Sequence, residues 1–122
     1  MSEVTDMVNN PPHYKDASGI ECIEVTRKMQ FCGGNCFKYL YRAGQKGSPI
    51  EDLEKARWYA VEAHNSSERV SYSAAQDIFK IADSRGREFI AQAMSELARE
   101  RWARVILFIS HEIAYLESLQ GE

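Results

Sequence analysis

The scarcity of helix breakers in the second half of the chain is the feature that most limits its fold. All three prolines lie before residue 66, and after that point the only glycines are Gly86 and Gly121. In this half apolar residues recur every three or four positions, which is the period of an α-helix. No segment of the chain alternates apolar and polar residues in the manner of a half-buried strand. The sequence therefore predicts an all-α protein.

The first half is predicted to begin with an extended arm over residues 1–19. Pro11-Pro12 cannot be helical there, because each proline fixes φ and biases the preceding residue toward an extended conformation. A short helix is expected over residues 20–29. Gly33-Gly34 should then break the chain, so that Asn35 caps the start of a second helix.

The third helix has the clearest start signal. Ser48, Pro49 and Glu51 form the pattern of a capping box with proline at the first helical position. An apolar stripe follows at helical spacing, and Trp58 and Val61 are expected to widen it. The stripe consists of Leu53, Ala56, Ala60 and Ala63. Asn65-Ser66-Ser67 ends this helix, which suggests a site module over residues 1–65 and a second unit over residues 66–122.

The second unit is predicted to be a long helical hairpin. Its first helix begins near Tyr72, a turn follows at residues 83–86, and one long helix should cover residues 87–119. The apolar residues of that long helix nearly form a heptad seam. Such a seam needs a partner surface, so the chain is expected to pack it against the first half or to be a homo-oligomer.

Charge and composition exclude several classes of protein. With 15 Lys and Arg against 18 Asp and Glu, the formal charge is −3, so bulk nucleic-acid binding is not expected and anion binding must depend on local clusters. The longest apolar run, Val105 to Ile109, is too short to cross a membrane. The acidic N-terminus lacks an apolar signal segment, and three cysteines are an odd number. We therefore expect a cytoplasmic protein whose cysteines are buried free thiols.

The most informative cluster of charges lies between Gly33 and Arg57. Lys38, Arg42 and Lys46 are spaced by four, and Lys55 and Arg57 add charge from the next helix. The N–H groups at Gly33-Gly34-Asn35 would open the second helix, where the positive end of the helix dipole favours an anion. Together these groups predict a cradle for one or two phosphates. The alternative is a solvated basic face that pairs with Glu51, Asp52 and Glu54.

Aromatic residues are interleaved with these cations, an arrangement that suits a nucleobase stacked beside a bound phosphate. Most of the rings must belong to the core, but Tyr39 and Tyr59 lie off the main apolar stripes and are the better ligand candidates. In the arm, His13, Tyr14 and Lys15 follow the stiff proline pair. His13 is a candidate proton shuttle or phosphate donor, or else a surface histidine in a docking arm.

No P-loop is present, because Gly44-Gln45-Lys46-Gly47-Ser48 lacks its spacing and no strand precedes it. Two carboxylate pairs occur at helical spacing, Glu21 with Glu24 and Glu51 with Glu54. Such pairs can hold Mg²⁺ on a helix face, although they are also common on solvated helices. If the chain is an enzyme, Glu21 and Glu51 are the candidate Mg²⁺ ligands.

Three ordered blocks of the chain resemble a known family. They cover residues 8–24, with the run Val8-Asn9-Asn10-Pro11-Pro12-His13-Tyr14-Lys15, then residues 31–44 and residues 51–59. The chain is similar here to a bacteriophage family long known as a domain of unknown function. That family includes a nucleotide kinase that phosphorylates deoxynucleoside monophosphates and lacks a P-loop. The resemblance implies a phage protein acting in the infected bacterial cell, with a polar site made of His13, Tyr14, Asn35, Lys38, Tyr39, Arg42, Lys46 and Lys55.

Three functions remain open on the sequence. In the first, the chain is a nucleotide kinase in which His13, Lys38 and Arg42 act on the transferring phosphate and the other cations bind it. In the second, it is a counter-defence protein that sequesters cyclic or modified nucleotides without catalysis. Both predict a nucleotide or nucleotide-derived small molecule as the ligand. In the third, the chain is a protein-interaction module, such as an inhibitor that docks through its acidic surface, and it binds no nucleotide.

Overall fold

A computed structural model describes residues 17–45, 47–86 and 88–121. The predictions for residues 1–16 of the arm, which include His13, Tyr14 and Lys15, and the prediction for Lys46 lie outside these residues. Within them the protein has helices and no strand, which confirms the all-α class. The helices are α1 (Cys22–Thr26), α2 (Phe31–Arg42), α3 (Pro49–Asn65), α4 (Tyr72–Arg85), α5 (Phe89–Ala98) and α6 (Trp102–Gln120).

The expected break at Gly33-Gly34 is wrong, because α2 begins at Phe31 and continues through both glycines. The Gly34 N–H donates to the Gln30 carbonyl at 2.8 Å, as in any helix. A Cβ on Gly33 would lie only 3.1 Å from the Trp102 ring. The glycine at position 33 therefore allows a close approach between α2 and Trp102 and does not end the helix.

The first helix is also shorter than predicted, since α1 covers five residues and not the whole of 20–29. A reciprocal capping box between Glu21 and Glu24 starts it. Only Cys22 and Val25 are buried in it, and Ile23 is exposed.

The third helix confirms its start signal. Ser48 accepts the Glu51 N–H at 3.3 Å, Pro49 is the first helical residue, and α3 ends at Asn65. The predicted apolar stripe is fully buried in the core, with Leu53, Ala56, Ala60 and Ala63. The expected widening of the stripe is wrong, because Trp58 and Val61 are exposed.

The single long helix predicted over residues 87–119 is wrong, because the chain breaks between α5 and α6. Glu100 adopts a left-handed φ of +63°. Its N–H donates to the Leu97 carbonyl at 3.0 Å, and the Arg101 N–H donates to the Glu96 carbonyl at 2.9 Å. These two bonds form a Schellman motif without the glycine that usually marks one. The second half is consequently three helices and not a hairpin.

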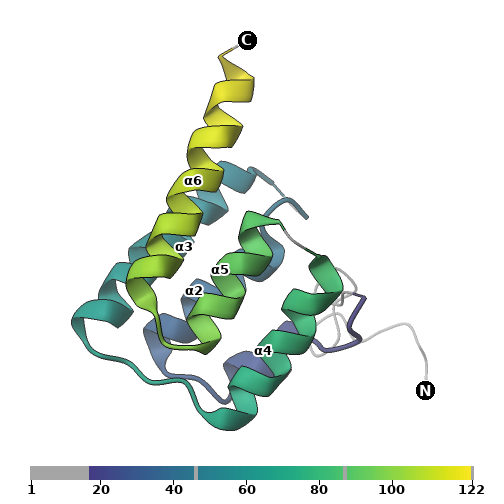
Figure 1. Cartoon of the computed structure of the whole chain (residues 1–122), viewed down its shortest axis with the longest axis vertical. Coiled ribbons are helices and arrows are strands. Elements are labelled where there is room, and N and C mark those ends of the chain that lie inside the picture. Colours follow the sequence, from purple (N-terminus) through teal and green to yellow (C-terminus); the bar gives the residue numbers. More distant parts are fainter. Residues whose placement is uncertain (1–16, 46, 87, 122) are drawn as a thin grey trace.

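The helices pack into one bundle around a continuous core. The neighbours are α2 with α3, α3 with α6, α6 with α5, and α5 with α4. Fully buried side chains from both halves of the chain meet in this core, among them Phe37, Tyr41, Ile78 and Leu97. Figure 1 shows α6 as the longest helix, with its C-terminal turns projecting beyond the bundle. Among the described helices, none is long and apolar enough to cross a membrane.

Candidate functional site

The first turn of α2, where the sequence predicted an anion site, is already occupied by a carboxylate of the chain itself. The Cys32 N–H and the Gly33 N–H donate to the two carboxylate oxygens of Glu68 at 3.0 and 2.7 Å. These are two of the N–H groups that an α-helix leaves unpaired at its start. Asn35 does not cap the helix either, since its side-chain amide donates to the Phe31 carbonyl one turn earlier at 2.9 Å. The predicted phosphate position at this end of α2 is therefore wrong.

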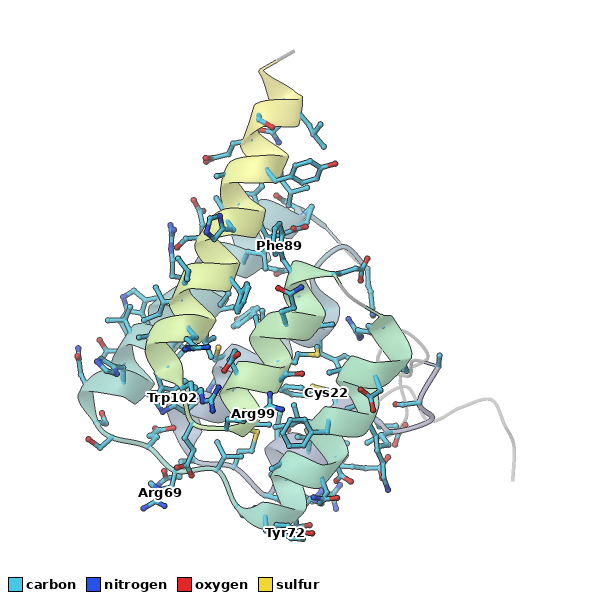
Figure 2. All side chains as sticks on the ribbon, in the orientation of Figure 1. Cys22, Arg69, Tyr72, Phe89, Arg99 and Trp102 are labelled. Atoms are coloured by element: carbon cyan, nitrogen blue, oxygen red, sulfur yellow. The ribbon has the colours of Figure 1, made fainter. Side chains whose placement is uncertain are left out.

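Glu68 belongs to a tightly bonded junction in the α3–α4 linker. Its carbonyl accepts the Trp102 indole N–H at 3.1 Å, and the Arg69 N–H donates to the Gln30 side chain at 2.7 Å. The Glu100 carboxylate accepts the Val70 N–H at 2.7 Å. Figure 2 shows Trp102 and Arg69 at the same end of the bundle. This end of the molecule is a structural junction between the two halves of the chain.

The junction also changes the chemistry of a cysteine. Burial, followed by the charge of Glu68 and a hydrogen bond to it, raises the pKa of the Cys32 thiol. A cysteine at a helix N-terminus usually has a lowered pKa and a reactive thiolate. Burial also raises the pKa of Cys36, and Cys22, Cys32 and Cys36 are all free thiols, as predicted. Cys22 and Cys36 are buried, whereas the prediction of burial is wrong for Cys32, which is half-buried.

Farther along α2, three cationic groups surround the ring of Tyr39. The Lys38 ammonium lies 4.6 Å from the ring centroid, the Lys55 ammonium 5.5 Å and the Arg42 guanidinium 5.7 Å. Lys38 and Arg42 come from α2, and Lys55 comes from α3, which packs against it. The structure therefore brings together three of the five cations that the sequence assigned to a phosphate site.

The charges of these cations are only partly compensated. Asp52, which is 2% exposed, receives the Arg42 Nε at 3.3 Å and fixes that side chain between α2 and α3. Lys55 lies 3.8 Å from Glu51, an exposed pair that contributes little binding energy. Lys38 forms no ion pair with any residue that the structure describes. The local charge is positive although the whole chain is acidic.

An aromatic surface adjoins the cations. Tyr39 stacks on Tyr59 with a centroid distance of 6.1 Å and an interplanar angle of 11°. Phe31 and Trp58 each meet the Tyr59 ring edge to face, at 6.0 and 5.1 Å. Phe31 is 72% exposed and Trp58 is 60% exposed. The predicted pair Tyr39 and Tyr59 is thus the half-buried base of a larger exposed aromatic cluster.

Phe31 was missed by the sequence analysis, although its spacing carries a signal. Phe31, Asn35, Lys38 and Arg42 recur every three or four residues and so form one stripe along α2. Beside the stripe is a hollow of about 270 Å³, lined in part by Met29, Phe31, Asn35 and Lys38. The stripe becomes recognisable only if the helix begins before the glycines.

Arg57 is not part of this group. Its guanidinium donates to the Ser110 hydroxyl of α6 at 3.1 Å, so it links α3 to α6. Arg57 therefore contacts α6, whereas the three cations around Tyr39 lie where α3 packs against α2.

The two candidate Mg²⁺ ligands do not assemble a metal centre in the described part of the chain. Glu21 uses its side chain in the capping box of α1, which leaves its Oε2 buried without a hydrogen-bond partner. Glu51 lies on α3 beside the Lys55 ammonium. No group of three or more potential metal-ligating side chains occurs among residues 17–45, 47–86 and 88–121. Among these residues, neither Glu21 nor Glu51 therefore belongs to a cluster that could hold a metal ion through the protein alone.

Comparison with known proteins shows that the cations around Tyr39 and the aromatic cluster lie in a segment that matches a family model. Residues 8–61 match the model of a family described as a protein of unknown function, DUF3310. A search of curated proteins and a search of solved structures each found no match. The matched segment contains the three cations around Tyr39 and the whole aromatic cluster. It ends before the Glu68 junction and before α4, α5 and α6.

Proposed function

We propose that the chain binds a nucleotide along the exposed face that α2 and α3 share. The observation that carries this proposal is the convergence of Lys38, Arg42 and Lys55 on the ring of Tyr39. Three cations whose charged groups lie 4.6–5.7 Å from one ring centroid repel one another. An anion with several negative oxygens relieves that repulsion.

Phosphate groups fit the different chemistry of the three cations. The Arg42 guanidinium is already oriented by the buried Asp52 carboxylate, so it can present its remaining N–H groups without further ordering. Lys38 and Lys55 act as point charges near the same ring. Tyr39 therefore forms the floor of the proposed phosphate site.

A nucleobase fits the aromatic end of the same face. Phe31 and Trp58 expose large ring surfaces next to the cations, and base–aromatic stacking contributes about 1–3 kcal/mol per base. Asn35 lies between Phe31 and Lys38 on the α2 stripe and lines the hollow beside them. Its amide nitrogen bonds to the helix, while its side-chain oxygen has no hydrogen bond to a described residue and can accept one from a base or sugar.

The family resemblance supports phosphoryl transfer as the reaction. In that reaction the terminal phosphoryl of a nucleoside triphosphate passes to a phosphate oxygen of a deoxynucleoside monophosphate, and two diphosphates result. Positioning and charge neutralisation supply most of the catalysis in such transfers, and Lys38, Arg42 and Lys55 provide the charge. By resemblance, His13 and Lys46 complete the site.

Isothermal titration calorimetry against a panel of nucleotides tests the binding proposal. We expect binding of at least one nucleoside phosphate, weakened about tenfold in each of the variants Lys38→Ala and Lys55→Ala. Lys80→Ala, which removes an exposed cation from α4, is the matched control and should bind normally. Absence of binding across the panel would overturn the proposal.

Thin-layer chromatography with labelled ATP and each deoxynucleoside monophosphate tests the reaction. A kinase produces labelled diphosphate, and Lys38→Ala should reduce its rate. Tight binding with the ligand recovered intact would instead support the sequestering function. That second function uses the same cations and rings but requires no transfer.

A further inference from the structure

The side of α6 that borders α5 carries a row of side chains whose charge changes sign along the helix. The members are spaced by three or four residues and therefore share one face. The row is Arg104, Phe108, Glu112, Tyr115 and Leu119, and the N-cap residue Arg101 precedes it. Together they begin with two cations and end with an acid and two exposed apolar side chains.

The basic end has more positive charge than its neighbours compensate. Arg101 and Arg104 both approach the same carboxylate, that of Glu96 on α5, at 3.4 and 4.0 Å. The Arg104 side chain is 63% exposed. One carboxylate thus serves two guanidinium groups, and Arg104 is the less satisfied of the two.

The acidic end has the opposite imbalance. Glu112 and Glu88 lie together at the start of α5 and line one hollow with Phe89 and Tyr115. Burial and the neighbouring charge of Glu88 raise the pKa of Glu112. Neither acid forms an ion pair with a residue in the described part of the chain.

Apolar side chains next to the acids are only partly covered by the described part of the chain. Tyr115 is 54% exposed, Leu119 is 50% exposed and Phe89 is 38% exposed. The last turns of α6 extend beyond the other helices in Figure 1, and Figure 2 shows Phe89 beside α6 at the point where this projection starts. A projecting helix end gains little stability from its own hydrogen bonds and depends on packing.

We propose that this face of α6 binds the same face of a second copy of the chain, with the two α6 helices antiparallel. Arg104 and Glu112 are each four residues from Phe108, and Arg101 and Tyr115 are each seven residues from it. A two-fold axis through Phe108 therefore places Arg104 opposite the Glu112 of the second copy and Arg101 opposite its Tyr115. Every contact occurs twice, as in an isologous dimer. A parallel pair would place like charges together.

This arrangement compensates both charge imbalances and covers the projecting end. The Arg104–Glu112 contacts give the acid at each end a cation, and the Arg101 guanidinium meets an aromatic ring. Phe89 and Phe108, already 6.4 Å apart within one copy, supply the apolar centre, and Leu119 lies toward each end of the interface. The face is formed by α5 and α6, so the dimer does not depend on the proposed nucleotide site on α2 and α3.

Analytical ultracentrifugation of the full chain and of two charge reversals tests the interface. The wild type should be a dimer at micromolar concentration. Arg104→Glu and Glu112→Arg should each weaken the dimer at least about tenfold, because each places like charges opposite one another. Lys80→Glu, a reversal on exposed α4, should remain dimeric.

Mixing the two variants distinguishes the interface from a general loss of structure. An Arg104→Glu chain and a Glu112→Arg chain have complementary charges at every pair, so an equimolar mixture should recover the dimer. A wild type that stays monomeric to about 100 µM, a dimer unaffected by both reversals, or a mixture that stays monomeric would each overturn the proposal.

Discussion

The two ends of α2 are both surrounded by charged groups, but they use those groups in opposite ways. At the first turn, the helix N–H groups are satisfied internally by Glu68, a residue 35 positions away from Gly33. In the second half of α2, Lys38 forms no ion pair with a described residue and lies near the Tyr39 ring with two other cations. The comparison shows that a helix N-terminus is an anion site only when no carboxylate of the chain reaches it.

Removal of the Glu68 carboxylate tests the structural end and should have the largest effect. Glu68→Ala leaves two N–H groups of α2 without acceptors, and we expect the free energy of unfolding to fall by about 2–4 kcal/mol. Urea denaturation followed by circular dichroism measures the change. Glu54→Ala, at an exposed position of α3, is the control and should change stability by less than about 0.5 kcal/mol. A Glu68→Ala protein as stable as this control would show that the capping contact is unimportant.

The prediction of α3 and the failure at α2 have a common physical explanation. Ser48, Pro49 and the alanine stripe are local signals, and the helix forms where they place it. Gly33 and Gly34 are also local signals for a break, but the close approach of Trp102 and the remote Glu68 decide their conformation. The spacing of residues in the sequence does not reveal contacts between residues that are so far apart in the chain.

The break between α5 and α6 was missed for a related reason. A Schellman motif is usually marked by glycine, and here Glu100 takes the left-handed position. Its carboxylate accepts the Arg69 Nε–H and the Val70 backbone N–H, so a tertiary contact helps to stabilise a backbone conformation that local preference opposes. The same limit applies to the candidate site. Lys38, Tyr39, Arg42 and Lys55 were found by spacing, whereas the part played by Asp52 depends on its burial.

The two adjacent glycines of α2 offer a second test of the structural end. In Gly33→Ala the new Cβ would lie 3.1 Å from the Trp102 ring, which its bond to the Glu68 carbonyl holds in place. We expect a loss of about 1–3 kcal/mol in the free energy of unfolding. In Gly34→Ala the nearest atom is 3.5 Å away, an ordinary contact.

Gly34→Ala should therefore raise the free energy of unfolding by about 0.5–1 kcal/mol, since alanine is the better helix former. Thermal and urea denaturation of the two variants side by side measure the difference. Equal effects at the two positions would contradict the close approach described for Gly33.

Neutralisation of Asp52 tests the cationic end of α2, where the proposed phosphate site lies. Asp52→Asn removes the buried negative charge that compensates the Arg42 guanidinium, while it keeps the shape of the side chain. We expect inorganic triphosphate to bind about threefold more tightly, because the three cations then have one counter-charge fewer, and stability to fall by about 1 kcal/mol.

Calorimetry with inorganic triphosphate at two ionic strengths measures this effect, which should shrink at high salt. Asp77→Asn is the control, since it removes one carboxylate charge from a more exposed pair with Lys28. Weaker triphosphate binding in Asp52→Asn would mean that Asp52 contributes by orienting Arg42 more than it opposes the bound anion.

The smallest expected effect concerns the reactivity of Cys32, and it reports directly on the carboxylate at the first turn. Burial and Glu68 raise the pKa of this thiol, so the thiolate fraction near neutral pH is low despite the position at a helix N-terminus. Glu68→Gln removes the charge but leaves an oxygen that can accept an N–H. The pKa of Cys32 should fall, and its alkylation by iodoacetamide at pH 7.5 should become about three- to tenfold faster. The rate for the wild type should rise at higher pH than the rate for the variant.

Peptide mass spectrometry follows Cys32 and Cys36 in the same sample, and the fully buried Cys36 should stay unmodified as long as the bundle remains folded. An unchanged Cys32 rate beside a protected Cys36 would show that Glu68 does not control the thiol, whereas joint modification of both cysteines would show that the helix end opens when the carboxylate is lost.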